Sequence, residues 1–184
     1  MKFVTRMSGG FSAMERLTSA SLTEAMTISP VVVLTAAAAL GSAAAGGIFY
    51  AFSTFVMRGL DRTGPVDAVT AMRGMNAEAN TNAPFLLFLL GSAMLSVIVG
   101  VIAVAQIGRP GSWYLLAGAI FGVLGVVITM AFNVPLNNHL DQVDLADAAA
   151  EWQAYFTTWT AWNHVRTASG FIGAVLLLVG LRYR

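Results

Sequence analysis

The residues with the greatest chemical potential lie in one short segment, Trp159-Thr160-Ala161-Trp162-Asn163-His164-Val165-Arg166. It brings indole, amide, imidazole and guanidinium groups together within eight positions. If the segment is helical, Trp159, Asn163 and Arg166 fall on one stripe, because they are separated by four and three residues. His164 is then turned about 100° from Asn163 around the helix axis. We therefore expect two faces of one helix to carry chemistry.

Arg166 is the most informative of these residues. A cation inside a membrane span costs about 2.5–3.5 kcal/mol on insertion scales unless it snorkels or pairs with an acid. The carboxylates available for an ion pair are Glu78, Glu151 and Asp141. The alternative is a cation that faces an anionic substrate or intermediate. The sequence is compatible with both.

The chain has only two histidines, His139 and His164. Histidine changes its protonation near neutral pH, so His164 is a candidate general base, although a simple interfacial position also explains it. With one carboxylate, the two histidines would match the ligand count of a non-haem iron site, and they are also candidate haem ligands. The sequence has no HxH, HxxxH or HExxH spacing. We therefore predict no cofactor and keep a metal or haem held by these histidines as the alternative.

Asparagines provide further polar groups. Asn133 and Asn137 are four residues apart, so they share a helix face if the helix continues past Pro135. An amide that faces lipid loses its hydrogen bonds, so these side chains must face other helices or the headgroups. Asn76 lies in a polar stretch that we expect at the same end of the molecule. Interhelical bonding and a ligand pocket both fit this pattern.

Aromatic residues gather beside these polar groups. Trp152, Tyr155, Trp159 and Trp162 precede the last apolar run, as in an aromatic belt at a membrane interface. Together with Tyr50, they would also suit the wall of a cleft for a flat polycyclic ligand.

Composition identifies the environment that must position these groups. Of 184 residues, 57% are hydrophobic and only 10% are charged, too few charges to cover a soluble surface. The net charge of +1 gives no electrostatic basis for nucleic-acid binding. The absence of cysteine excludes disulfides, zinc ribbons and thiol catalysis. The sequence predicts an integral membrane protein whose partners are the lipid bilayer and a hydrophobic small molecule.

Four apolar runs predict four membrane helices. Each of the first three charge-free runs exceeds the roughly 20 residues needed to cross a bilayer. The expected helices cover residues 30–56, 84–106, 113–135 and 159–181, joined in an up-down bundle, with loops over 58–82 and 136–158. Small residues four positions apart, such as Gly118 and Gly122 or Gly170 and Ala174, predict close helix packing. Residues 29–184 would form one membrane domain.

Lysine and arginine predict the orientation. Six lie on the side of both termini and the 107–112 turn, and four lie on the other side. The positive-inside rule then places both termini in the cytoplasm, in the plasma membrane. Residues 1–28 lack the apolar core of a signal peptide and are expected to form a cytoplasmic tail or an interfacial segment.

Several motifs resemble the anthrone oxygenase-like membrane proteins, a family long classed as a domain of unknown function. The matching segments are Phe49-Tyr50-Ala51-Phe52-Ser53, Ala71-Met72 with Asn76, Phe132-Asn133-Val134-Pro135-Leu136-Asn137, and Trp159-Thr160 with Trp162-Asn163-His164-Val165-Arg166-Thr167. They extend over about residues 46–171. The chain departs from the pattern at Arg58, where proline is expected in many members, and at Arg73, where glutamine is expected. These two departures bear on substrate identity.

The resemblance implies a four-helix membrane protein. Fungal relatives oxidise anthrones to anthraquinones, so it also implies an oxygenase that uses O2 on an electron-rich polycyclic or phenolic molecule. His164 would act as the base, and Asn137, Asn163 and Arg166 would stabilise the enolate oxygen. Substrate binding would fall to Tyr50, Asn76, Asn133, Trp159 and Trp162.

Two other functions fit the same residues. One is a non-catalytic accessory or small-molecule-binding membrane protein that uses the polar end for packing. The other is a redox component that binds haem, quinone or metal through His139 and His164.

Overall fold

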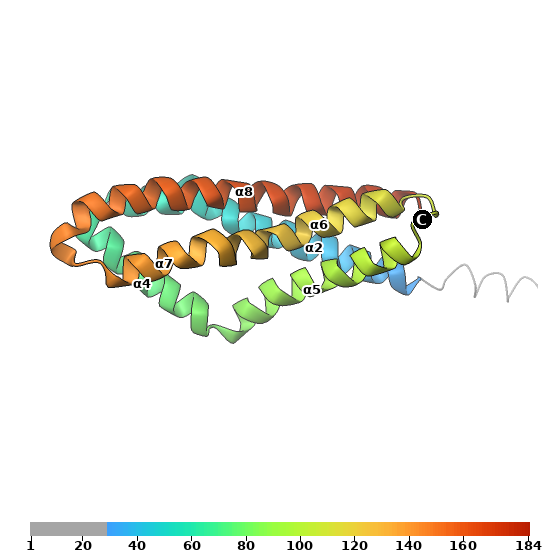
Figure 1. Ribbon diagram of the computed structural model, residues 1–184, viewed down its shortest axis with the longest axis horizontal. Helices are drawn as coiled ribbons and strands as arrows, with labels where there is room; N and C mark the ends of the chain where they lie inside the picture. The colour runs from blue at the N-terminus through green and yellow to red at the C-terminus, as the bar shows by residue number, and fades with distance from the viewer. Residues whose placement is uncertain (1–28) are drawn as a thin grey trace, which may run out of the picture.

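The computed structural model describes residues 29–184, so the segment expected as a tail, 1–28, lies outside the described residues. The described chain is almost entirely helical (Figure 1). Its elements are α2 (Pro30–Ala51), the π-helical turn η1 (Phe52–Val56), α3 (Met57–Asp61), α4 (Pro65–Thr81), α5 (Ala83–Ala105), α6 (Ser112–Ile128), the π-helical turn η2 (Thr129–Asn133), α7 (Val134–Gln142), the 3₁₀ turn η3 (Leu145–Asp147) and α8 (Ala148–Arg182).

Four continuous helical stretches are long and apolar enough to cross a membrane: Pro30–Asp61, Ala83–Ala105, Ser112–Gln142 and Leu145–Arg182. They confirm the prediction of an all-α integral membrane protein with four spans. Three of the spans are longer than the sequence indicated. Two of them are longer because α2 and α6 run through their π-helical turns into α3 and α7, and the third because α8 begins at Ala148.

The prediction of loops over residues 58–82 and 136–158 is wrong, because most of both segments is helical. The apolar runs marked only the most apolar part of each helix. α4 is a helix because it buries one face, with Val69, Met72 and Asn76 at spacings of three and four residues. It starts at Pro65, directly after Gly64, whose φ of +92° suits glycine.

α4 and α5 share the fourth position of the bundle, each along about half of its length. Figure 1 shows them meeting in a V, with α4 beside α7 and α8 and α5 beside α2 and α6. The corner is Asn82, whose Oδ1 accepts a hydrogen bond from Phe85 N at 3.0 Å, followed by Pro84 in the first turn of α5. The molecule therefore has an α4 end and an α5 end.

Each end has its own core. At the α4 end, buried residues from α3, α4, α7 and α8 pack together, among them Met57, Met72, Leu140, Trp152 and Trp159. At the α5 end, the core is aliphatic and consists of Ala38, Ala39, Val99, Ala103, Leu115 and Leu177.

Glycine contacts bring α8 close to its neighbours, as the spacing of small residues predicted. A Cβ placed on Gly170 would lie 2.8 Å from Cα of Gly46 in α2. A Cβ on Gly118 in α6 would lie 2.8 Å from the backbone N of Leu177. The two most extensive helix contacts, α2 with α8 and α6 with α8, depend on these approaches.

Candidate functional site

The π-helical turns η1 and η2 lie beside the middle of α8. In each turn, a backbone N–H bonds five residues back, Met57 to Phe52 and Val134 to Thr129. Pro135 accounts for the second turn, because it has no N–H to continue the α-helical pattern. The helix widens there and then continues to Gln142, so Pro135 neither ends the span nor separates Asn133 from Asn137.

Asn163 of α8 is fully buried and bonds to the first of these turns. Its Nδ2 donates to the carbonyl oxygen of Phe49 at 2.7 Å and to Oγ of Ser53 at 2.6 Å. A widened turn interrupts the regular backbone bonding, and the side chain of Asn163 supplies an outside donor at this point. The amide is therefore part of the contact between α8 and η1.

Arg166 lies one turn further along α8 and is 5% exposed. Its Nη2 donates to Oδ1 of Asn163 at 2.6 Å, and its Nη1 donates to Oγ1 of Thr129 at 3.1 Å. Its Cζ also lies over the rings of Phe49, at 4.4 Å, and Trp159, at 4.9 Å, as in cation–π contacts. The predicted stripe of Trp159, Asn163 and Arg166 thus faces the bundle interior.

The guanidinium of Arg166 has no carboxylate partner within residues 29–184. Of the two alternatives that the sequence left open, the ion pair with Glu78, Glu151 or Asp141 is therefore wrong. The one ion pair in this part of the chain joins His139 Nε2 to Glu151 Oε2 at 2.9 Å. Arg166 is held by neutral oxygens and aromatic rings instead. Its Nε makes no hydrogen bond in the described part of the chain.

Asn133 and Asn137 both face α8, as their spacing predicted. Asn133 Nδ2 donates to the carbonyl oxygen of Trp159 at 3.3 Å. Oδ1 of Asn137 accepts from Tyr155 Oη at 2.8 Å and from Trp159 Nε1 at 2.9 Å. These bonds tie η2 and α7 to α8. They also satisfy the hydroxyl of Tyr155 and the indole N–H of Trp159, which are both buried.

His164 points away from this cluster, as its position on the helix predicted. It is exposed and lines a groove of about 290 Å³ between α8 and the η1–α3 segment. The groove is lined by Ser53, Met57, Arg58, Phe156, Thr157, Thr160, Ala161 and His164. Ser53 therefore belongs both to the groove and to the hydrogen-bonded cluster of Asn163 and Arg166.

Two hydroxyls of this groove keep unused hydrogen-bonding capacity. Oγ of Ser53 accepts from Asn163, and its own proton is free for Thr167, 3.3 Å away, or for a bound molecule. Oγ1 of Thr160 is buried and has no hydrogen-bond partner within residues 29–184. Arg58 of α3 adds a cation to the groove lining, across from His164 of α8. An imidazole, a guanidinium and two hydroxyls thus line one groove.

The aromatic residues expected to wall one slot face three directions. Trp159 is buried beside Phe52 and Tyr155. Trp162 stacks on Phe132, with ring centroids 3.6 Å apart and an interplanar angle of 7°. Tyr50 is 54% exposed and touches Phe171 edge-on. Asn76 lies buried on α4, with its Nδ2 unpaired in the described chain.

The two histidines do not share a site. His139 bonds to Glu151, which precedes His164 on α8 by 13 residues, or about 20 Å of helix axis. Within residues 29–184, no three His, Asp or Glu side chains lie close enough together to hold a metal ion. One metal or haem bound by both histidines is therefore incompatible with this geometry.

Sequence reasoning did not single out Thr129, and it noted Ser53 and Thr160 only within motifs. A signal for Thr129 was present, because Thr129, Asn133 and Asn137 form a polar stripe at four-residue spacing in an apolar span. Ser53 offered no comparable pattern, since isolated hydroxyls commonly bond to their own helix.

Comparison with known proteins adds one match. The family model described as anthrone oxygenase matches residues 84–176, half of the chain. The match covers α5, α6, η2, α7 and most of α8, with Asn133, Asn137, Asn163, His164 and Arg166. No curated protein and no solved structure matches the chain.

Proposed function

The chain belongs to the anthrone oxygenase family, and from this premise we propose that it is a membrane-bound oxygenase that uses O2 on an anthrone-like or similar electron-rich polycyclic phenol. The observation that carries the proposal is the groove in which His164, Arg58, Ser53 and Thr160 meet. Its volume of about 290 Å³ is near the lower end of the range of small-molecule sites.

The proposed reaction needs a base and a means of holding negative charge. An anthrone carries a methylene group in the ring that bears its carbonyl, and removal of one methylene proton gives an enolate. The enolate reduces O2, and the resulting carbon–oxygen bond gives a peroxide at the former methylene carbon. Loss of water from the peroxide leaves the second carbonyl, so anthrone and O2 give anthraquinone and water.

Each groove residue has a role in this proposal. His164 removes the methylene proton, and Arg58 with the hydroxyl of Ser53 stabilises the enolate oxygen. Met57 and Phe156 provide the apolar surface against which the rings lie. The amide of Asn163 and the two terminal nitrogens of Arg166 form hydrogen bonds within the bundle, so we assign both residues to positioning: Arg166 holds Asn163, and Asn163 holds Ser53.

The remaining predicted site residues support the groove from a distance. Asn133 and Asn137 fix α7 against α8, and Trp159 fills the core between them. Tyr50 and Trp162 lie outside the groove lining, so we do not assign them a contact with substrate.

Oxygen consumption by the purified full-length protein tests this function. With anthrone itself as the substrate, we expect enzyme-dependent O2 uptake and formation of anthraquinone in equal amounts. Uptake without anthraquinone would contradict the reaction. Binding of anthrone to the protein without any uptake would favour the alternative, a non-catalytic small-molecule-binding membrane protein.

For the orientation, we propose that both termini face the cytoplasm and that the α4 end faces outward across the plasma membrane. The six lysines and arginines on the terminal side, against four on the other, support this assignment. The groove would then receive a hydrophobic ligand at the outer membrane surface.

A further inference from the structure

A small cavity lies at the centre of the bundle, apart from the groove of His164. Its volume is about 20 Å³, and all four spans contribute to it. Its polar lining consists of Ser42 of α2, Ser92 of α5, and Arg166 and Ser169 of α8. Since about 10–15 Å³ suffices for one water molecule, the cavity accommodates a single particle of that size.

Two hydrogen-bond donors at this cavity have no partner within residues 29–184. They are Nε of Arg166 and Oγ of Ser42, and both side chains are at least nine-tenths buried. The other two hydroxyls differ, because Ser92 donates to the carbonyl oxygen of Phe88 at 2.7 Å and Ser169 donates to that of Arg166 at 2.8 Å. The unpaired groups therefore require an acceptor.

The charge of Arg166 indicates the kind of acceptor. The guanidinium stays protonated and is 5% exposed, near the middle of a membrane-spanning helix. The groups that bond to it, Asn163 and Thr129, are neutral. A buried cation without an opposite charge is costly, and an anion beside it would offset that cost.

We propose that this cavity binds one small monovalent anion, a halide such as chloride, between Nε of Arg166 and the hydroxyl of Ser42. A volume of about 20 Å³ suits a monatomic ion better than a carboxylate or a phosphate. The site is separate from the proposed oxygenase groove and does not depend on that function.

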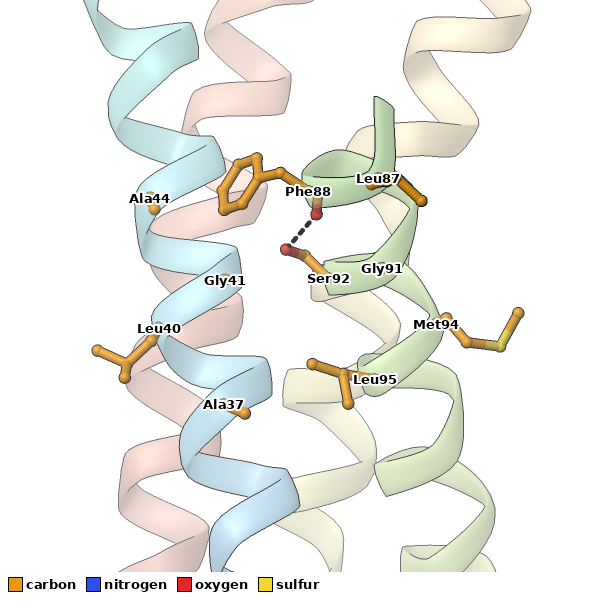
Figure 2. A pocket seen from close by; sticks show the side chains of 10 residues that line it. All are labelled: Ala37, Leu40, Gly41, Ala44, Leu87, Phe88, Gly91, Ser92, Met94 and Leu95. Carbon is orange, nitrogen blue, oxygen red and sulfur yellow. Dashed lines mark hydrogen bonds between the residues drawn. The ribbon is translucent and has the colours of Figure 1, made fainter. Parts of the chain in front are cut away.

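Ser92 of the cavity lies at the contact between α2 and α5. Figure 2 shows the groove between α2 and α5, where the hydroxyl of Ser92 lies between the two helices toward Gly41. A Cβ on Gly41 would come within 2.5 Å of Oγ of Ser92, so the helices are in close contact here. Ser92 lines both the outer groove and the cavity. This contact keeps the anion in a low-dielectric interior, where its attraction to Arg166 is strong.

Thermal unfolding of the full-length protein in detergent tests the site. Sodium chloride is titrated against sodium gluconate at constant ionic strength. A ligand that binds only the folded state raises the unfolding midpoint in a saturable manner. We expect this effect with chloride and bromide and none with sulfate. In crystals grown with bromide, the anomalous signal should lie between Ser42 and Arg166.

Two serine variants make the test specific. Ser42→Ala removes a donor to the anion and should weaken chloride binding about tenfold or more. Ser96→Ala is the matched control, because Ser96 is also buried but donates to the carbonyl oxygen of Ser92 and does not line the cavity. It should bind chloride as the wild type does. Arg166→Gln should abolish chloride binding. If the Arg166→Gln protein does not fold, the chloride affinity of Ser42→Ala tests the site instead.

Equal unfolding midpoints in chloride and gluconate would overturn the proposal. So would electron density for a water molecule in the cavity of a bromide-grown crystal with no anomalous signal there.

Discussion

The amide nitrogen of Asn163 lies 2.6 Å from the hydroxyl oxygen of Ser53 and donates a hydrogen bond to it. Asn163 in turn accepts from the guanidinium of Arg166, so the contact joins a buried cation to the wall of the groove that contains His164. The two faces of α8 are therefore connected through a residue of another helix. This connection gives the buried residues a way to influence a ligand that they do not touch.

The first prediction concerns the base. His164→Ala should lower the kcat for anthrone oxidation by about 10²–10⁴-fold, since proton removal would lose its base. Oxygen uptake measures the rate. Because the groove is open, added imidazole should restore part of the activity. Thr158→Ala, an exposed change on the same helix outside the groove, is the control. Full activity in His164→Ala would remove this residue as the base.

The second prediction concerns Ser53. If its hydroxyl stabilises the enolate oxygen, Ser53→Ala should lower kcat by about 10²–10³-fold with little change in KM. The neighbouring Thr54→Ala should have the wild-type rate, because the hydroxyl of Thr54 donates to the carbonyl oxygen of Tyr50 in its own helix. A change confined to KM in Ser53→Ala would indicate a role in ground-state binding instead.

The third prediction concerns helix packing. Gly170→Ala should destabilise the protein by about 1–3 kcal/mol, because its Cβ would meet the backbone of Gly46 at 2.8 Å and cannot be accommodated by a side-chain rotation. Gly47→Ala is the matched control, since a Cβ there meets nothing within 4 Å. Thermal unfolding in detergent compares the two. Equal midpoints would show that α2 and α8 separate more easily than the contact indicates.

The fourth prediction concerns Arg73, one of the departures from the family pattern. Its guanidinium donates to the carbonyl oxygens of Leu140, at 2.9 and 2.7 Å, and Val143, at 2.5 Å, at the C-terminal end of α7. Arg73→Met should cost about 1.5–3 kcal/mol and speed hydrogen exchange in α7. The exposed change Arg62→Met should have no such effect. Unchanged exchange in Arg73→Met would mean that water replaces these bonds without loss.

The fifth prediction concerns orientation. The chain has no cysteine, so single cysteines report position without further changes. An impermeant thiol reagent added to intact cells should label Asp144→Cys and leave Gly108→Cys unlabelled; both positions are exposed. The opposite labelling pattern would place the termini outside.

The sequence by itself determined the membrane environment, the four spans and the two faces of α8. These properties are local, because hydropathy follows from composition along one segment and the face of a side chain follows from helical periodicity. For the same reason, the spacing of Asn133 and Asn137 predicted that both would point toward the same neighbour. The family, too, could be identified from motifs within single helices.

Tertiary structure alone decided which groups meet. The carboxylates near the span ends were plausible partners of Arg166, yet packing placed Asn163, Thr129 and two aromatic rings around it. Glycine contacts set the distance between α2 and α8, and that distance brings Ser53 to Asn163. The helical form of α4 was also hidden, because a polar helix is stabilised by the partner that covers one of its faces. Contacts between helices depend on how all of them pack, and no single segment of sequence contains that information.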